Sequence, residues 1–231
     1  EMLVILPFEK DFYKKHQVNA HFVGHPLLDA ISDLAPIDAE NFKKENGLND
    51  KEIIALLPGS REQEVEKMLS LMLSVRDYFK NYQFVIAGAP SLPKEFYQKF
   101  VDDDVHFVSN KTYDLLRCSK AALVTSGTAT LETALLNVPE IVCYRTSTIS
   151  YEIGKRVVKN IKFISLVNLI MDREIVKELI QKELNTENLV NELQKILEGQ
   201  KRDKMLKNYE LLREKLGGKG ASEHAAEIIV N

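Results

Sequence analysis

Short apolar runs alternate with amphipathic stretches along the middle of this chain, and this alternation limits the possible folds most strongly. The runs at 53–57, 83–88, 105–109, 121–124, 140–144 and 163–167 each have the length of a buried strand. Helical spacing fills the intervals and predicts helices at 62–80, 93–101, 112–118, 128–137 and 151–159. Strands joined by helical crossovers form a mainly parallel sheet. We therefore predict a doubly wound, Rossmann-like α/β domain with helices on both faces of the sheet.

Both ends of the chain depart from this alternation. Residues 2–6 predict a strand, 8–16 a helix, and 21–31 a strand followed by a helix. After residue 168 the strands stop, and helices are expected at 173–184, 187–199, 200–216 and 222–230. We predict a remnant of a preceding domain or a linker at 1–20, the Rossmann-like domain at 21–216, and a crossover helix at 217–231. Because the first predicted strand begins at residue 2, we expect this chain to be a piece of a longer protein.

The composition is that of an ordinary globular protein. The chain has 231 residues, of which 45% are hydrophobic and 28% are charged. A net charge of −3 gives no electrostatic reason to expect nucleic acid as a partner. No apolar run approaches the roughly 18 residues of a membrane span. Cys118 and Cys143 lie in or beside apolar runs, so we expect buried thiols in a reducing cytosol rather than a disulfide.

The junction between the apolar run 121–124 and the sequence TSGTATLE at 125–132 is the strongest functional signal. Backbone N–H groups and small hydroxyl side chains at the start of a helix suit a phosphate or diphosphate. We expect Ser126, Gly127 and Thr128 to face such a group. Glu132 could then reach sugar hydroxyls. The alternative is a capped tight turn, with Glu132 in the first helical turn stabilised by the helix dipole.

A second junction, IIALLPGSREQEV at 53–65, repeats this arrangement with an arginine. Gly59 allows close approach of the backbone to a ligand, and Arg61 can bind a diphosphate through paired hydrogen bonds. Ser60 and Gln63 also fit a capping box, which would explain both without a ligand. A cation in the first turn of a helix costs a few tenths of a kcal/mol, so Arg61 favours an anionic partner.

Weaker signals lie elsewhere in the chain. Small residues at 88–90 would let a flat base lie near the sheet edge, and His25 could donate to a phosphate or sugar, although a lone histidine is more often structural. The basic cluster of Lys155, Arg156, Lys159 and Lys162 suits a solvated helix face or an anionic membrane surface. No metal-binding, GxSxG or Walker motif is present. We therefore expect neither a metal nor a cofactor.

Six ordered motifs together resemble one family, the lipid-A-disaccharide synthases, which are glycosyltransferases of the two-Rossmann-domain (GT-B) type. The motifs are VGHPL (23–27), LPGSREQEV (57–65), IAGAP (86–90), TSGTATLE (125–132), CYR (143–145) and SLVNLI (165–170). The resemblance covers nearly the whole chain but corresponds to the C-terminal half of the family's enzymes. It implies one half of a GT-B fold, with the acceptor-side domain and the catalytic base outside this chain.

The resemblance also implies an activity. The family transfers 2,3-diacylglucosamine from UDP-2,3-diacylglucosamine to 2,3-diacylglucosamine 1-phosphate, forming lipid A disaccharide 1-phosphate and UDP. The chain would hold the UDP-sugar donor and be inactive without the missing N-terminal domain. The full-length protein would be cytoplasmic and would work peripherally at the cytoplasmic face of the bacterial inner membrane on its lipid acceptor.

The motifs assign residue roles by resemblance. Arg61 and Asn168 would be catalytic, stabilising charge and positioning the donor, and Glu132 would bind the ribose. The remaining donor-binding residues would be Gly59, Ser60, Ala87, Gly88, Ala89, Ser126, Gly127, Thr128, Gln181 and His25, with the 87–90 loop on the uracil. The family usually has proline where Val167 and Lys177 stand here, which weakens the assignment of Gln181.

Three alternatives remain open from the sequence. A UDP-sugar 2-epimerase would have the same architecture, the chain could be a nucleotide-binding module without catalysis, or it could be a non-catalytic interaction protein. The last helix is a separate case, because its apolar residues would lack the preceding domain as a partner. We expect it to be disordered or to mediate a homodimer.

Overall fold

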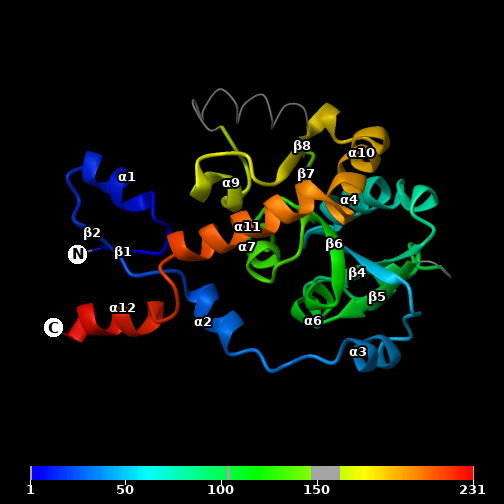
Figure 1. Cartoon of the computed structure of the whole chain (residues 1–231), viewed down its shortest axis with the longest axis horizontal. Helices are drawn as coiled ribbons and strands as arrows, with labels where there is room; N and C mark the ends of the chain where they lie inside the picture. Colours follow the sequence, from blue (N-terminus) through cyan, green and yellow to red (C-terminus); the bar gives the residue numbers. More distant parts are fainter. Residues whose placement is uncertain (1, 103–104, 147–161, 231) are drawn as a thin grey trace.

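A sheet of six parallel strands forms the centre of the molecule, in the order β5-β4-β3-β6-β7-β8 (Figure 1). The computed structural model describes residues 2–102, 105–146 and 162–230. The strands are β3 (Glu52–Leu57), β4 (Tyr82–Gly88), β5 (Val105–Ser109), β6 (Ser119–Thr125), β7 (Glu140–Tyr144) and β8 (Lys177–Ile180). The chain runs outward from β3 to β5 and then returns to β6 on the other side of β3. This reversal confirms the predicted doubly wound fold.

Helices cover both faces of the sheet. One core contains the side chains of Ile54 and Leu56 from β3, and the other contains those of Ile53, Ala55 and Leu57. The first core is closed by α4 (Glu62–Leu73), α7 (Thr128–Leu135), α9 (Leu166–Met171), α10 (Thr186–Leu197) and α11 (Gln200–Lys215). The second is closed by α3 (Ala39–Glu45) and α6 (Thr112–Arg117). The strands are therefore apolar on both faces, as their continuous apolar runs indicate.

Short elements complete the domain, and neither cysteine forms a disulfide. The 3-10 helix η1 (Arg76–Tyr78) follows α4, and α5 (Lys94–Gln98) connects β4 to β5. The helix α3 was not predicted from the sequence. Cys118 and Cys143 are both free thiols, as predicted, but only Cys143 is buried and Cys118 is half-buried. The helix expected at 151–159 lies outside the described residues.

Two predictions about the last strand were wrong. The run 163–167 is not a strand, because Ser165 caps the N-terminus of α9 by accepting a hydrogen bond from the Asn168 N–H over 3.3 Å. The region 173–184 is not a helix, since it contains β8 and the 3-10 helix η2 (Gln181–Glu183). In β8, pairing with β7 buries Leu179. A short apolar run does not by itself distinguish a buried strand from a buried helix.

The two chain ends meet at one end of the molecule (Figure 1). There β1 (Met2–Val4) and β2 (Ala20–Phe22) form a small parallel sheet, and α1 (Glu9–Lys15) connects the two strands. The helix α12 (Ala221–Val230) starts against α2 (Pro26–Ser32), where the carboxylate of Asp29 accepts from the Gly220 N–H at 2.6 Å and the Ser222 N–H at 3.2 Å. The proposed boundary at residue 20 stays a prediction, although β1 and β2 pair across it.

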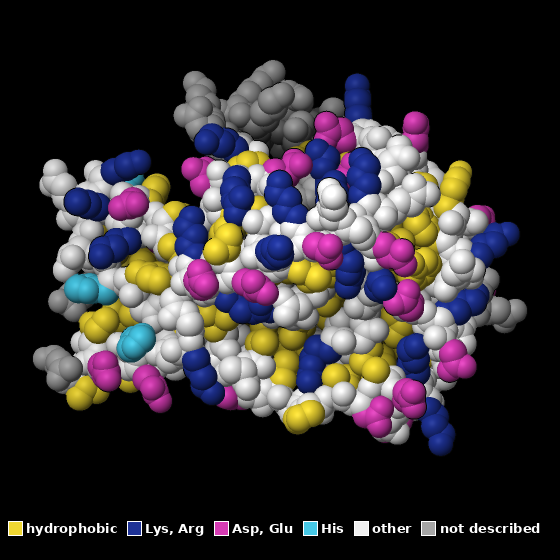
Figure 2. Space-filling view, viewed as in Figure 1, with side chains coloured by type: hydrophobic (Ala, Val, Ile, Leu, Met, Phe, Trp, Pro, Cys, Tyr) yellow, Lys and Arg dark blue, Asp and Glu magenta, His cyan; other side chains and the backbone are white. Residues whose placement is uncertain are grey.

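The surface of this end carries apolar side chains, and Figure 2 shows several of them. On α12, Ile229 is 74% exposed and Val230 is 84% exposed. The expectation that the last helix is disordered was wrong, because Asp29 supplies the start of α12 with hydrogen-bond acceptors. Self-association through the helix stays a prediction.

One buried carboxyl group in the first core makes the stability of the protein depend on pH. The side chain of Glu140, at the start of β7, is completely buried, and its oxygens have no hydrogen-bond partner among the described residues. Burial raises the pKa of this carboxyl group well above its ordinary value, and the charge of Glu178 raises it further. The group therefore holds a proton in the folded protein at a pH where the unfolded chain has lost it.

We expect Glu140→Met to stabilise the protein increasingly from pH 5 to pH 8. Because the folded-state pKa is the higher one, wild-type stability falls as pH rises above the unfolded pKa, by up to about 1.4 kcal/mol per pH unit until the folded pKa is reached. Urea denaturation at the two pH values measures this difference. Glu210→Met, on the exposed side of α11, is the control and should show no such trend. A gain for Glu140→Met that is independent of pH would contradict the assignment.

Candidate functional site

Three loops at the carboxyl ends of β3, β4 and β6 enclose a cleft of about 390 Å³. It lies where the strand order reverses, which is the usual ligand position in open α/β sheets. The residues that line it are Leu57, Gly59, Ser60, Glu64, Ala87, Gly88, Ala89, Pro90, Thr112, Thr125, Ser126, Gly127, Thr128, Ala129 and Glu132. All of the site residues predicted from the sequence are therefore in the cleft, except Arg61, Asn168, Gln181 and His25.

The loop after β3 requires glycine at position 59. Gly59 has a φ of +111°, and a Cβ there would overlap the carboxylate of Glu64. That carboxylate accepts a hydrogen bond from the Ser60 N–H over 3.4 Å. The predicted capping box was wrong, because α4 begins one residue later, with Arg61 as its N-cap, and no side chain in the described part of the protein caps it. The start of α4 thus keeps backbone donors that a ligand could use.

The loop after β4 is shaped by two aromatic rings. The rings of Tyr97 and Phe107 are stacked, with centroids 4.7 Å apart. A Cβ at Gly88 would overlap the Phe107 ring, so the close approach there needs glycine. The Tyr97 Oη accepts a hydrogen bond from the Ala89 N–H over 3.0 Å. Because this N–H is already used, recognition of a base by the loop would depend on its other groups.

The loop after β6 leads directly into α7. The N-cap of α7 is Gly127, which has no side chain to cap the helix. Ser126 is occupied, since its Oγ donates to the Ile164 carbonyl over 3.1 Å and its N–H donates to the Cys143 carbonyl over 3.1 Å. Thr128 and the first N–H groups of α7 are therefore the better candidates for contacting an anion.

Glu132 is the fifth residue of α7, so its expected position in the first turn was wrong. The helix dipole acts mainly within the first turn and explains this carboxylate poorly. The Tyr113 Oη donates to Glu132 Oε1 over 3.1 Å. Burial raises the pKa of Tyr113 to about 12, with a further contribution from the Glu132 charge. Sequence reasoning missed Tyr113, because no local pattern marks a tyrosine that meets a residue from another helix.

Besides Asn168, three predicted residues lie outside the cleft lining. Arg61 is exposed and directly follows Ser60, so its side chain starts at the edge of the cleft. His25 is only 7% exposed and caps α2, its Nδ1 accepting from the Leu27 N–H over 3.2 Å. Burial lowers the pKa of this imidazole. Gln181 lies past the end of β8, where its Oε1 accepts from the Thr146 N–H over 3.2 Å.

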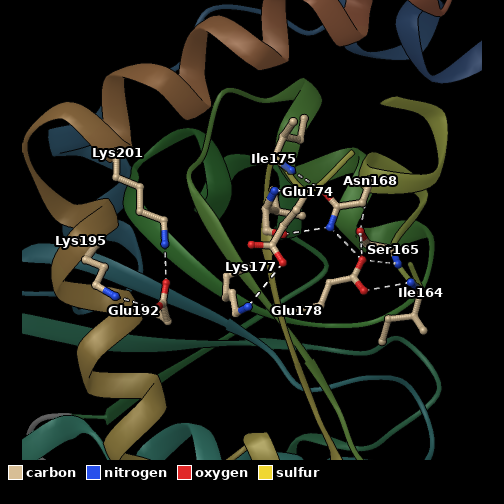
Figure 3. Close-up of polar contacts among 11 residues, drawn as sticks. Ile164, Ser165, Asn168, Glu174, Ile175, Lys177, Glu178, Glu192, Lys195 and Lys201 are labelled. Carbon is tan, nitrogen blue, oxygen red and sulfur yellow. Dashed lines mark hydrogen bonds and ion pairs between the residues drawn. The ribbon is translucent and has the colours of Figure 1, made fainter. Parts of the chain in front are cut away.

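Asn168 lies in a buried hydrogen-bond network, and its predicted catalytic role stays a prediction. Its side chain is completely buried, and Figure 3 shows its polar contacts. The Nδ2 donates to the Val176 carbonyl and to Glu178 Oε1, both at 2.9 Å. The Oδ1 accepts from the N–H groups of Ile175 at 2.7 Å and Val176 at 3.1 Å. These four bonds use the full capacity of an amide, so no donor or acceptor remains for a substrate.

Glu178 on β8 is the centre of this network, and no sequence motif predicted its role. Besides the Asn168 amide, its carboxylate accepts from the Ile164 N–H at 3.0 Å and from the Ser165 N–H and Oγ at 2.9 and 2.7 Å (Figure 3). The Ile164 carbonyl in turn accepts from Ser126 at the cleft. The network thus holds the segment that supports the loop after β6.

Within the described residues, no group of three or more His, Cys, Asp or Glu side chains could hold a metal ion. The expectation that the reaction needs no metal or cofactor stays a prediction. The helices in that part of the chain are also too short or too polar to cross a membrane.

Solved structures with the same fold define the class of protein. UDP-GlcNAc 2-epimerase from Neisseria meningitidis, bound to UDP-GlcNAc, is 16% identical with a TM-score of 0.64, over 99% of this chain and 60% of that one. CalG4, the calicheamicin glycosyltransferase, is 13% identical with a TM-score of 0.58, over 99% of this chain and 52% of that one. The chain is therefore a Rossmann-like α/β domain of the kind found in GT-B proteins.

The family follows from sequence similarity. A family model described as lipid-A-disaccharide synthetase matches residues 1–230. The chain is 39% identical over 234 residues to the lipid-A-disaccharide synthase of Syntrophus aciditrophicus, and 35% over 238 residues to that of Myxococcus xanthus. The chain belongs to the lipid-A-disaccharide synthetase family, as the motifs predicted. These matches cover 97% and 99% of the chain but only 61% of each relative.

Proposed function

We propose that the full-length protein transfers 2,3-diacylglucosamine from its UDP derivative to 2,3-diacylglucosamine 1-phosphate, and that this chain supplies the donor site. The observation that carries the proposal is the meeting of three glycine-containing loops and Glu132 in one cleft. Membership of the lipid-A-disaccharide synthetase family supports the reaction. The same membership disfavours a UDP-sugar 2-epimerase, which shares the fold at much lower identity.

In this proposal the diphosphate lies against the starts of α4 and α7. Both helices present backbone N–H groups there, and their dipoles favour negative charge. Arg61 neutralises charge from the edge of the cleft. Glu132 accepts hydrogen bonds from the ribose, and the 87–90 loop covers the uracil. No metal is required, because helix ends and an arginine carry the charge.

The reaction is a displacement at the anomeric carbon of the donor. The 6-hydroxyl oxygen of the acceptor forms a bond to this carbon, and the bond from the carbon to the β-phosphate oxygen breaks. The bonding electron pair leaves with UDP, so negative charge builds on the β-phosphate. Donors already oriented toward that position stabilise the charge. The hydroxyl proton goes to a base that we place outside this chain.

We expect Glu64 to oppose nucleotide binding. Its carboxylate lines the cleft and accepts a hydrogen bond from the Ser60 N–H, so its negative charge lies where the diphosphate is proposed to bind. Repulsion between unit charges about 4 Å apart is about 1 kcal/mol even in bulk water. We expect Glu64→Gln to raise the affinity for UDP about fivefold and to leave that for uridine, which lacks phosphates, unchanged. Calorimetric titration of the full-length protein measures both constants. Weaker UDP binding by the variant would show that Glu64 supports the site.

Product analysis tests the function directly. The full-length protein is incubated with UDP-2,3-diacylglucosamine and 2,3-diacylglucosamine 1-phosphate, and products are identified by mass spectrometry. The expected products are UDP and a disaccharide 1-phosphate, and Glu132→Ala should form them slowly. An epimerised UDP-sugar, or no conversion of the donor by wild type, would reject the proposal.

Two further parts of the proposal concern location and assembly. The protein would be cytoplasmic and peripheral at the inner membrane, as its lipid substrates require, and it would form a homodimer through α12. The exposed Ile229 and Val230 support the dimer. Absence of binding to anionic vesicles would reject the first part, and a monomeric mass by light scattering would reject the second.

A further inference from the structure

Tyr113 and Glu132 form a hydrogen bond beside the cleft that the proposed reaction does not yet explain. The Tyr113 Oη donates to Glu132 Oε1 over 3.1 Å. Tyr113 lies in the first turn of α6, next to the cleft-lining Thr112, and Glu132 reaches the cleft from α7. Both side chains are half-buried. The contact therefore joins two helices at a point that is partly removed from water.

Glu132 binds a ligand more tightly if another residue already holds its carboxylate in place. Its side chain has several rotatable bonds, and ordering it costs conformational entropy. If the free protein does not order the carboxylate, the ligand has to supply that cost on binding. The Tyr113 ring is much more restricted and is itself half-buried. A hydrogen bond from it orders the carboxylate before the ligand arrives.

The chemistry of the pair leaves room for a ligand. An ionised carboxylate only accepts hydrogen bonds, and its two oxygens offer about four positions. Tyr113 fills one position on Oε1, so Oε2 and a second position on Oε1 can accept from two neighbouring hydroxyls. Because the pKa of Tyr113 is raised to about 12, the phenol stays a donor throughout the neutral range.

We propose that Tyr113 is a positioning residue, which holds the Glu132 carboxylate ready for the 2′- and 3′-hydroxyls of the donor's ribose. The role rests on the proposed function, in which Glu132 binds that ribose. It predicts that Tyr113 contributes to the choice of ribonucleotides over 2′-deoxyribonucleotides, although it touches neither hydroxyl.

The test is a calorimetric titration of UDP and 2′-deoxy-UDP into the full-length protein. We expect Tyr113→Phe to bind UDP about fivefold more weakly than wild type, because the ligand then has to order the Glu132 side chain itself. The preference for UDP over 2′-deoxy-UDP should fall toward that of Glu132→Ala. In the Glu132→Ala background, Tyr113→Phe should have no further effect. Tyr78→Phe, which removes the same hydroxyl at an exposed position, is the control.

The outcomes separate this role from the proposed function. If wild type prefers UDP and Tyr113→Phe keeps the whole preference, the positioning role is overturned while the donor site stands. The same holds if Tyr113→Phe weakens UDP equally with and without the Glu132 carboxylate, since its effect would then be general. If wild type binds no uridine nucleotide, the donor site and the role of Tyr113 are both overturned.

Discussion

Arg61→Ala in the full-length protein is expected to slow disaccharide synthesis about 100-fold without destabilising the fold. Removing one oriented donor to a developing negative charge commonly costs about 3 kcal/mol of transition-state stabilisation. Arg61 is exposed and is the N-cap of α4, where a positive charge opposes the helix dipole. Its removal should therefore leave the stability unchanged or slightly raised. Steady-state rates and urea denaturation of the same variant measure the two effects separately.

Two variants make the Arg61 result specific. Lys162→Ala removes another exposed cation, whose only ion pair among the described residues is with Asp172 at 3.5 Å, and it should keep nearly full activity. Arg61→Lys keeps the charge but loses the planar pair of donors, so an intermediate rate is expected. Equal rates for wild type and Arg61→Ala would remove Arg61 from the site.

Most of the sheet could be predicted from the sequence because both of its faces are buried. Strands such as β3 and β6 are apolar runs between turn residues, and their regular alternation with helical stretches favours strands over buried helices. The edge strand β8 could not be predicted in this way. Lys177 and Glu178 make it look like part of a polar helix, and its strand conformation depends on pairing with β7 and on the distant Asn168.

The cleft was predicted well where residues follow a strand and poorly where they meet through space. Gly59, Gly88 and Gly127 lie at strand ends, and the parallel sheet brings such ends together. Tyr113 and Glu178 have no comparable local signal, since their partners lie 19 residues away and 10 to 14 residues away in the chain. Such contacts depend on how helices pack, which the spacing of residues does not determine.

Asn168→Ala is expected to lower the free energy of unfolding by about 3 to 5 kcal/mol. The substitution leaves a buried carbonyl, two buried N–H groups and part of the Glu178 carboxylate without partners. Each buried group left unsatisfied costs about 1 to 3 kcal/mol. Urea denaturation measures the loss. Asn41→Ala removes an exposed amide bonded to Glu45 at 2.8 Å, and it should change the stability by less than about 0.5 kcal/mol.

A second substitution separates the structural role of Asn168 from a catalytic one. Asn168→Asp keeps an oxygen for the N–H groups of Ile175 and Val176 but places a carboxyl group against Glu178. Burial and the Glu178 charge should raise the pKa of the new carboxyl, so the variant should be closest to wild type at low pH and lose stability as pH rises. Activity lost at unchanged stability would instead mean that Asn168 contacts the substrate. A structural role requires that activity and stability fall together, because among the described residues the network reaches the cleft through Ile164 and Ser126.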